Sequence, residues 1–126
     1  MMHQLSQRFY FDAAHTLNRA SRPAEEADSS KRIHGHTYWA ELMLEGEPDP
    51  RTGMVVDLGL VRQHIERLRA QLDHAFLDEL PGLGVPTLEN LCSHILAQLQ
   101  AALPTLVAVR VWRDSTGDGC TLRRVP

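Results

Sequence analysis

The stretch that decides the fold runs from His34 to Glu45 and reads HGHTYWAELMLE. Its side chains alternate in character, and the apolar set on one face is Tyr38, Ala40, Leu42 and Leu44. The polar set on the other face is Thr37, Glu41 and Glu45. A period of two predicts a strand with one buried face. Residues 47–53, EPDPRTG, are rich in turn-forming types, so the strand ends before them.

Toward the N-terminus, a second strand is predicted from Leu5 to Ala14, where Phe9, Tyr10 and Phe11 supply aromatic side chains that favour strands. Between the two strands, Asn18 to Arg32 are mostly Ser, Arg, Glu, Asp and Pro. This composition predicts a solvated loop. Structureless loops of about 15 residues inside a compact domain are usually functional or disordered.

Toward the C-terminus, the spacing of apolar residues changes to three and four, which predicts two amphipathic helices. The first begins after Asp57, a good N-cap, and its apolar positions are Leu58, Val61, Ile65, Leu68 and Leu72. The segment 81–86, PGLGVP, separates it from the second helix. That helix is capped by Thr87, and its apolar positions are Leu88, Leu91, Cys92, Ile95 and Leu99.

The remaining chain predicts a final hairpin, with strands from Leu106 to Trp112 and from Cys120 to Val125 joined by a turn at Gly117-Asp118-Gly119. Asp114 and Asp118 are interpreted as ordinary turn residues. The order ββααββ predicts an α+β fold, a four-stranded antiparallel sheet with two helices on one face. Such a sheet keeps two free edges, which favours self-assembly through them. The whole chain, 1–126, is expected to form a single domain.

The composition excludes several classes of protein. Of the 126 residues 43% are hydrophobic and 23% are charged, with a net charge of −3, which argues against a nucleic-acid partner. No apolar run is long enough for a membrane span or a signal peptide. The two cysteines, Cys92 and Cys120, cannot form the disulfide framework of a secreted domain. We therefore expect a cytoplasmic protein without membrane contact.

Three of the seven histidines predict a metal site. His34 and His36 are two apart on a strand, so both imidazoles point to one face. Pairing of the first two strands brings His15, at the end of the first, beside them. Three histidines with an open fourth position are the pattern of catalytic zinc. A His-x-His pair also arises by chance, so the motif alone is weak. His3, His64 and His94 are interpreted as structural or solvated.

Asp73-His74 is a second candidate, at the end of the first helix. A carboxylate beside an imidazole can orient it as a proton acceptor. The alternative is a histidine that complements the negative end of the helix dipole. Neighbours in sequence need not be hydrogen-bonded in space, and the residues alone favour the dipole interpretation.

Five motifs occur together in one order, and the chain resembles the 6-pyruvoyl-tetrahydropterin synthase and 6-carboxytetrahydropterin synthase family. The motifs are FDAAH (11–15), HGH (34–36), GMVVD (53–57), LDH (72–74) and PTLENL (86–91). The resemblance covers Phe9 to Cys120. It implies the tunnelling fold, or T-fold, and a hexamer of two trimers in which the edges of neighbouring sheets pair.

The same resemblance implies that His15, His34 and His36 bind zinc, which holds the side-chain hydroxyls of 7,8-dihydroneopterin triphosphate. Asp73 and His74 match a proton-relay pair that reaches the active site from a neighbouring subunit. Thr87 matches a segment that contacts the pterin. The implied reaction eliminates triphosphate and gives a 6-pyruvoyl- or 6-carboxytetrahydropterin, the latter with release of acetaldehyde in bacterial queuosine biosynthesis.

The chain departs from the family at two positions. Ser30 stands where a catalytic cysteine is usual, and a hydroxyl is far more basic than a thiol, so its role is doubtful. A glutamate normally binds the pterin after the third strand. Alignment on Gly119-Cys120 puts Asp114 there, whereas alignment on the preceding valines puts Arg113 there. We favour Asp114, because a carboxylate can accept the same paired hydrogen bonds.

Three functions remain open from the sequence. The first is a zinc-dependent synthase that eliminates triphosphate with His74 or zinc-bound hydroxide in place of the cysteine. The second keeps fold and zinc but acts on a different or dephosphorylated pterin, through retro-aldol cleavage of the side chain. The third is a non-catalytic pterin-binding module, which the retained Asp73-His74 pair argues against.

Overall fold

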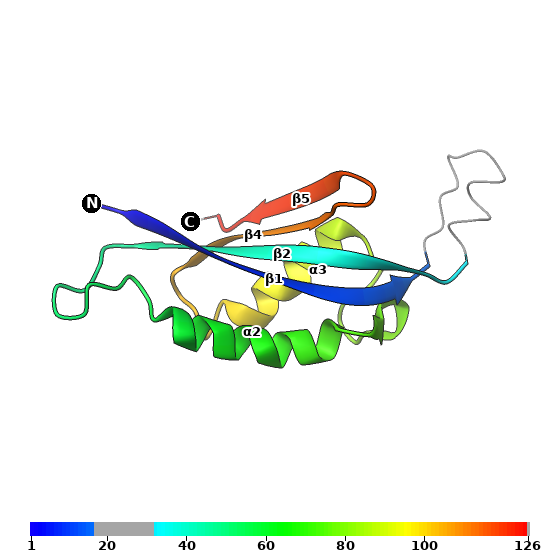
Figure 1. Cartoon of the computed structure of the whole chain (residues 1–126), viewed down its shortest axis with the longest axis horizontal. Helices are drawn as coiled ribbons and strands as arrows, with labels where there is room; N and C mark the ends of the chain where they lie inside the picture. The colour runs from blue at the N-terminus through cyan, green and yellow to red at the C-terminus, as the bar shows by residue number, and fades with distance from the viewer. Residues whose placement is uncertain (17–31, 126) are drawn as a thin grey trace.

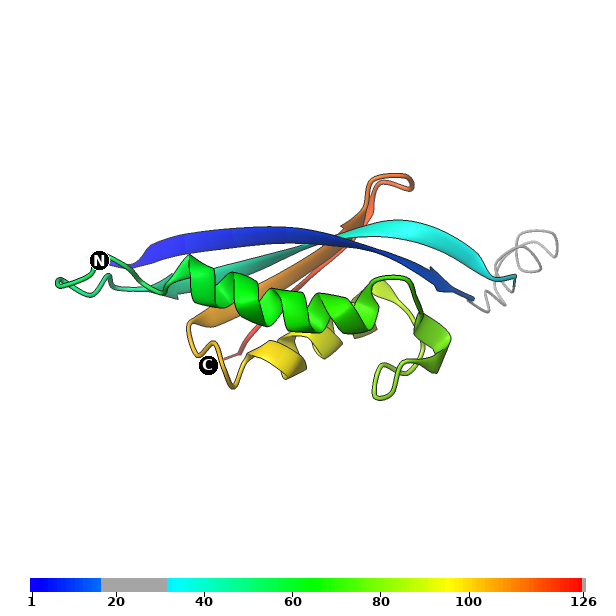
Figure 2. The ribbon, with the colours of Figure 1, turned by 60° about the horizontal axis from the view of Figure 1, so that its bottom comes forward.

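A computed structural model describes residues 1–16 and 32–125 of the chain. These residues form one five-stranded sheet in the order β3-β1-β2-β4-β5, with helices α2 and α3 on one face (Figures 1 and 2). The strands are β1 (His3–His15), β2 (His34–Gly46), β3 (Ala75–Phe76), β4 (Leu106–Arg113) and β5 (Asp118–Arg123). The helices are α2 (Leu58–Leu72), the 3-10 helix η1 (Leu77–Glu79) and α3 (Leu88–Leu99). The arrangement confirms the predicted α+β T-fold.

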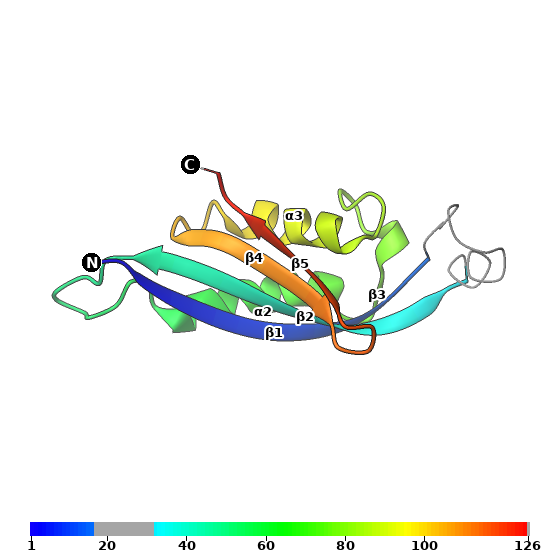
Figure 3. The same ribbon diagram turned by 90° about the horizontal axis from the view of Figure 1, so that it is seen from above.

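Strands β1 and β2 form a long antiparallel pair that positions the candidate site. Their register runs from His3 opposite Gly46 to His15 opposite His34. Strand β4 pairs with β2, and β5 pairs with β4, both antiparallel. Because one strand face carries every second side chain, this register puts Phe11, Tyr38 and Val111 on the same side of the sheet. The sheet is seen with the helices behind it in Figure 3.

Both helices begin at the predicted caps. Asp57 Oδ1 accepts a hydrogen bond from the Gly59 N–H at 2.8 Å, and Thr87 Oγ1 accepts one from the Asn90 N–H at 3.1 Å. Each cap satisfies a backbone donor that has no partner within its own helix. The helical stripes then bury their apolar side chains against one face of the sheet. Buried core residues include Phe9, Phe11, Leu42, Leu44, Val61, Ile65, Leu72, Leu91, Ile95 and Val109.

The structure corrects the prediction of four strands. Strand β3 has only two residues and pairs parallel with the end of β1, Ala13 opposite Ala75 and Ala14 opposite Phe76. Two residues are too few to give an alternating pattern, so the sequence carries no signal for this strand. The pairing fixes the segment after α2 against the end of β1, beside the candidate site.

The structure also corrects the position of the last turn. The turn covers residues 114–117, and Gly117 takes a φ of 75° and donates its N–H to the Arg113 carbonyl at 2.9 Å. Strand β5 therefore begins at Asp118, which pairs with Arg113. Asp118 was predicted to be an ordinary turn residue, and this was wrong. A positive φ suits glycine, so Gly117 closes the turn instead of opening it.

In the described part of the chain no helix combines the length and the apolar character that a bilayer crossing requires.

Candidate metal and substrate site

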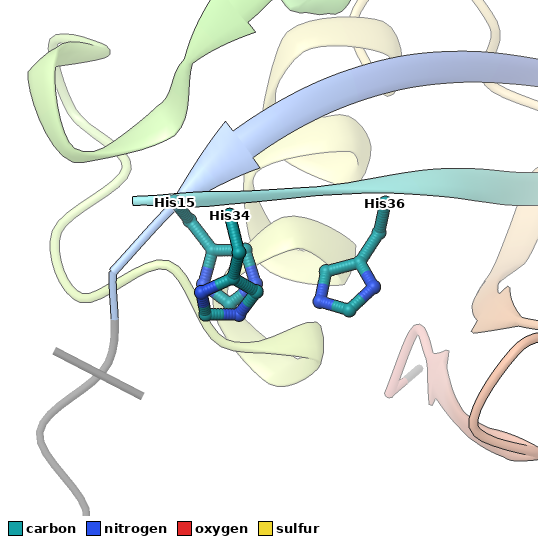
Figure 4. A group of neighbouring side chains, drawn as sticks. All are labelled: His15, His34 and His36. Atoms are coloured by element: carbon teal, nitrogen blue, oxygen red, sulfur yellow. The ribbon is translucent and has the colours of Figure 1, made fainter. Parts of the chain in front are cut away.

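His15, His34 and His36 come together at the end of the β1–β2 pair, as predicted. Their possible ligand atoms all lie within 4.8 Å of one another. His15 is buried and the other two are partly buried. Figure 4 shows the three imidazoles pointing to the same side of the strands. Since His15 lies directly opposite His34, the strand register alone produces the cluster.

Backbone carbonyls fix the orientation of two of these rings. His15 Nδ1 lies 3.3 Å from the Thr16 carbonyl oxygen, and His34 Nδ1 lies 2.8 Å from the Arg32 carbonyl oxygen. A carbonyl only accepts, so Nδ1 carries the proton and Nε2 keeps a free lone pair. His15 Nε2 is buried and has no hydrogen-bond partner among the described residues. An orphaned imidazole nitrogen beside two others fits a metal ion.

The charge state of the rings also suits a metal. Burial, with the charge of Arg113 and the neighbouring histidines, lowers the pKa of His36 to about 4. Burial is also the main cause that lowers the pKa of His15. Both rings are therefore neutral at pH 7, and neutral imidazole is the form that binds a divalent cation. The donor set fits zinc with an open coordination position.

Asp78 holds the end of β1 next to His15. Its Oδ1 accepts a hydrogen bond from the Thr16 N–H at 2.9 Å, and its Oδ2 accepts one from the Thr16 hydroxyl. This contact links η1 to the residue that follows His15. The sequence analysis missed Asp78, because nothing in the local pattern connects residues so far apart in the chain.

Arg113 and Tyr38 extend the same face of the sheet beyond the histidines. Tyr38 is 1% exposed, and its ring centroid lies 5.8 Å from that of His36. The Arg113 Cζ lies 6.0 Å from the Tyr38 ring centroid. Burial raises the pKa of Tyr38 to about 12, so its hydroxyl stays protonated. Sequence reasoning missed Tyr38 as a site residue, although continuing the alternation from His34 and His36 would have found it.

Arg113 is paired with Asp118 across β4 and β5. Its Nε donates to Asp118 Oδ1 at 3.3 Å, and its Nη2 donates to Asp118 Oδ2. These hydrogen bonds lower the pKa of Asp118 to about 2. Asp114, which we predicted to bind the pterin, is exposed in the turn that follows Arg113.

Asp73 and His74 are in contact, as a proton-relay pair requires. His74 Nδ1 lies 3.0 Å from Asp73 Oδ2, and Asp73 Oδ1 accepts a hydrogen bond from the Asp12 N–H at 2.9 Å. The Asp12 N–H is the main cause that lowers the pKa of Asp73. The His74 backbone has a φ of 60° and its N–H donates to the Asp12 carbonyl at 2.6 Å. Its side chain is 82% exposed and free to act on a ligand.

His74 lies in a cleft beside the end of β1. A cleft of about 410 Å³ is lined by Asp12, Ala13, Ala14, Gly35, His36, Thr37, His74 and Ala75. The side chains of Asp12 and Thr37 alternate with those of the cluster, so they point to the face away from the helices. Thr37 donates its hydroxyl to Asp12 Oδ1 at 2.5 Å. His74 and His36 therefore line the same cleft, together with these polar residues.

Of the other residues singled out from the sequence, those that the structure describes are not part of the cluster. Thr87 caps α3, and Ser30 lies outside the described residues. Among the other histidines, His3 is exposed, His64 is partly buried and His94 is buried on α3. Burial raises the pKa of the Cys92 thiol to about 12, and this thiol donates to the Cys120 carbonyl. Cys92 therefore cannot supply the thiolate that the family uses.

Comparisons with known proteins identify the family of this chain. A family model described as 6-pyruvoyl tetrahydropterin synthase matches residues 4–124. The chain belongs to this family. A 6-carboxy-5,6,7,8-tetrahydropterin synthase from Synechocystis sp. is 32% identical over 114 residues, which cover 86% of this chain and 84% of that protein. Relatives of this chain are named as pterin synthases.

Two further relatives bear on reaction and fold. A dihydroneopterin monophosphate aldolase from Pyrococcus furiosus is 29% identical over 97 residues, covering 77% of this chain and 75% of that protein. The solved structure of Caenorhabditis elegans 6-pyruvoyl tetrahydropterin synthase superposes with a TM-score of 0.83 at 23% identity, over 99% of this chain and 97% of that one. The superposition on the Caenorhabditis elegans structure supports the T-fold.

Proposed function

We propose that this chain is a zinc-dependent lyase that converts 7,8-dihydroneopterin triphosphate to 6-carboxy- or 6-pyruvoyl-tetrahydropterin with loss of triphosphate. The observation that carries the proposal is the cluster of His15, His34 and His36, with ligand atoms within 4.8 Å, in a chain of the pterin-synthase family. The relative from Synechocystis, named for the 6-carboxy product, supports the first of the two products.

The three histidines are the residues that would hold zinc, through nitrogens whose lone pairs are free. A zinc ion there would supply Lewis-acid polarisation of the hydroxyl and carbonyl oxygens of the substrate side chain. The Thr16 and Arg32 carbonyls keep two of the rings in a fixed orientation and tautomer. Asp78 acts on the site indirectly, through its hydrogen bond to Thr16, the residue that follows His15.

His74 is the group that would take and return a proton on the substrate side chain. With Nδ1 directed at the Asp73 carboxylate, its Nε2 is the nitrogen that can accept a proton. The imidazolium formed in that transfer is stabilised by the same carboxylate. Its side chain is exposed, and the family resemblance gives this pair a role in the active site of a neighbouring subunit, so we propose that His74 serves a neighbouring copy of the chain. This fits a hexamer built as a dimer of trimers.

Two residues of this chain are proposed to contact the pterin, Thr87 and Asp114. Thr87 begins α3, and a substrate there would meet backbone groups near the helix start. Asp114, in the turn after β4, would accept hydrogen bonds from the amino and ring N–H groups of the pterin, and Arg113 is the alternative at this position. Ser30, at the position of the usual cysteine, is not assigned a proton-transfer role, because its hydroxyl is too basic.

A second candidate is retro-aldol cleavage of the side chain of a less phosphorylated pterin. The similarity to the Pyrococcus furiosus monophosphate aldolase favours it. The serine at position 30, in place of the usual cysteine, also favours it. The first deprotonation of such a substrate needs a weaker base than the first deprotonation in the synthase reaction. The same zinc site and the same His74 would be used.

A product assay separates these candidates. The zinc-loaded protein is incubated separately with dihydroneopterin triphosphate, dihydroneopterin monophosphate and dihydroneopterin, and products are resolved by mass spectrometry with an acetaldehyde assay. Triphosphate release with a tetrahydropterin product supports the synthase. A 6-hydroxymethyl product from the monophosphate or the free pterin supports the aldolase. Pterin binding without turnover of any substrate contradicts both and leaves a binding module.

The role of His74 is tested by His74→Ala, with His64→Ala on α2 as the matched control. We expect turnover to fall by about 10²- to 10⁴-fold in His74→Ala, as for loss of a general acid–base. Zinc content is expected to be unchanged in both variants, since His74 is not part of the cluster. Full activity of His74→Ala would contradict the proposed proton transfer.

A further inference from the structure

A buried arginine faces the candidate site from β4. The side chain of Arg113 is 9% exposed, and it continues the buried face made by Val109 and Val111. Its Cζ lies 6.0 Å from the Tyr38 ring centroid, which is itself 5.8 Å from the His36 ring centroid, so Arg113 lies beside the cluster. Buried arginines are rare without a partner or a ligand.

Asp118 satisfies only part of this guanidinium. It accepts from Nε and Nη2, whereas Nη1 has no hydrogen bond to any described residue. Next to it, the Tyr38 hydroxyl is buried and donates to no described residue. Buried polar groups nearly always have hydrogen bonds, so the Tyr38 hydroxyl indicates a missing acceptor beside Arg113. An arginine offers five N–H donors and no acceptor, and the missing partner must therefore bring oxygen lone pairs.

We infer that Arg113 is a specificity-determining residue of the site, whose free N–H groups bind an acceptor oxygen of the substrate beside the histidine cluster. Asp118 is the positioning residue that holds the guanidinium in place. The acceptor oxygen could come from the oxo group of the pterin ring or from a phosphate of the side chain. The inference rests on the proposed function and deepens it, because it defines which part of a pterin this site recognises.

The choice between Arg113 and Asp114 follows from the register of the sheet. Trp112 pairs with Trp39, and Arg113 pairs with Asp118, so residue 113 is the last strand residue on the face of the cluster. Residue 114 already belongs to the turn and is exposed. A site with an arginine at this point favours acceptor groups over the donor edge that a carboxylate would bind.

Equilibrium binding to the zinc-loaded protein tests the inference with four probes. Two of them, 6-hydroxymethylpterin and 2,4-diamino-6-hydroxymethylpteridine, differ only in a ring oxo group replaced by an amino group. The other two, neopterin triphosphate and inorganic tripolyphosphate, report on phosphate. Wild type is compared with Arg113→Gln, with Asp118→Asn and, as the control, with Arg110→Gln at an exposed position of β4. Asp114→Asn tests the competing candidate for the pterin contact. Zinc content and the thermal unfolding midpoint of each variant are measured in parallel, so that only folded, zinc-loaded protein is compared.

If the ring oxo group is the ligand, Arg113→Gln weakens binding of 6-hydroxymethylpterin about tenfold or more and leaves the diamino probe unchanged. If phosphate is the ligand, the same variant weakens both phosphate probes and leaves both hydroxymethyl probes unchanged. Asp118→Asn is expected to shift the same probes in the same direction, by a smaller factor. A merely structural ion pair would not change the discrimination between matched probes.

Wild-type affinities for all four probes in Arg113→Gln would overturn the inference while leaving the proposed function intact. Loss of pterin binding in Asp114→Asn but not in Arg113→Gln would overturn it in favour of Asp114. Failure of the wild-type protein to bind any of the three pteridine probes would instead contradict the proposed function. Tripolyphosphate binding by Arg113 remains measurable in that case, so the two failures are distinguishable.

Discussion

One face of the β1–β2 pair changes character along its length. Near its middle this face carries Phe9, Leu42 and other apolar side chains, which α2 and α3 cover. At the end where His15 meets His34, the same face carries imidazoles, a tyrosine hydroxyl and a guanidinium. The alternation of the strands is unbroken between the two parts. The site therefore continues the core face of the sheet with polar side chains. The two parts differ in the interactions that their side chains need, which are apolar packing in one part and hydrogen bonds or a ligand in the other.

The same alternation of side chains therefore builds both the apolar core and the polar site. In the apolar part, each side chain is stabilised by removal from water and by contact with the helices. In the polar part, two buried atoms have no partner among the described residues, His15 Nε2 and the Tyr38 hydroxyl. Such groups cost stability and are retained where a ligand binds. Stability and binding should then respond differently to substitutions in the two parts.

The largest effect is expected from Leu42→Ala, in the apolar part. Leu42 is fully buried between the sheet and the helices, and its truncation leaves a cavity. We expect a loss of about 3 kcal/mol in the free energy of unfolding, measured by urea denaturation of the metal-free protein. Leu60→Ala, at an exposed position of α2, is the control and should cost far less. The zinc affinity of folded Leu42→Ala should equal that of wild type; a large decrease would mean that the two parts are not separable.

The polar part is tested by His15→Leu, which extends the apolar pattern through the cluster. Zinc affinity should fall by more than about 100-fold, because loss of a metal ligand costs more affinity than loss of a group that hydrogen-bonds to a ligand. The metal-free protein should gain about 1 kcal/mol of stability, since an unsatisfied buried nitrogen is removed. His3→Leu, at the exposed start of the same strand, is the control for the added hydrophobicity. Zinc binding that survives His15→Leu would exclude His15 as a ligand.

A smaller effect should appear in the pH dependence of stability. His36 has a pKa of about 4 in the folded protein, against about 6.5 for an unperturbed histidine in the unfolded chain. As the pH falls from 6.5 to 4, the unfolded chain therefore takes up a proton that the folded protein does not, and stability decreases. Below about pH 4 both states are protonated and the loss is complete. Solvent screening of the partly exposed ring limits the expected loss to about 1 kcal/mol at pH 5.

Urea denaturation of the metal-free protein at pH 7.5 and pH 5 measures this loss, with His36→Asn as the comparison. The variant should lose less stability than wild type over the same interval. An equal loss in both proteins would assign the pH dependence to other groups, such as His15 or His94, whose pKa values burial also lowers.

The elements predicted correctly from the sequence are those in which apolar residues recur with a regular period. The strand His34–Gly46 and the helix Leu58–Leu72 show their periods over many residues, and the register of long strands brings His15 to His34. Strand β3 was missed, because two residues carry no period. Asp118 was misplaced, since the position of a turn depends on which glycine takes a positive φ. The partners of Arg113 lie across strands and could be found only from the register.

The position of the metal ligands on either side of a long connection has a consequence for unfolding. His15 ends β1 and His34 begins β2, so a bound ion would join the two strands where the intervening segment leaves and re-enters the sheet. Such an ion acts as a reversible cross-link that lowers the entropy of the open chain, as a disulfide does. Amide hydrogens of the last pairs, Ala13 with His36 and His15 with His34, should then exchange with solvent far more slowly when zinc is present. In the metal-free chain, this end of the sheet should be the first to open, so zinc supply would set how long the assembled site persists.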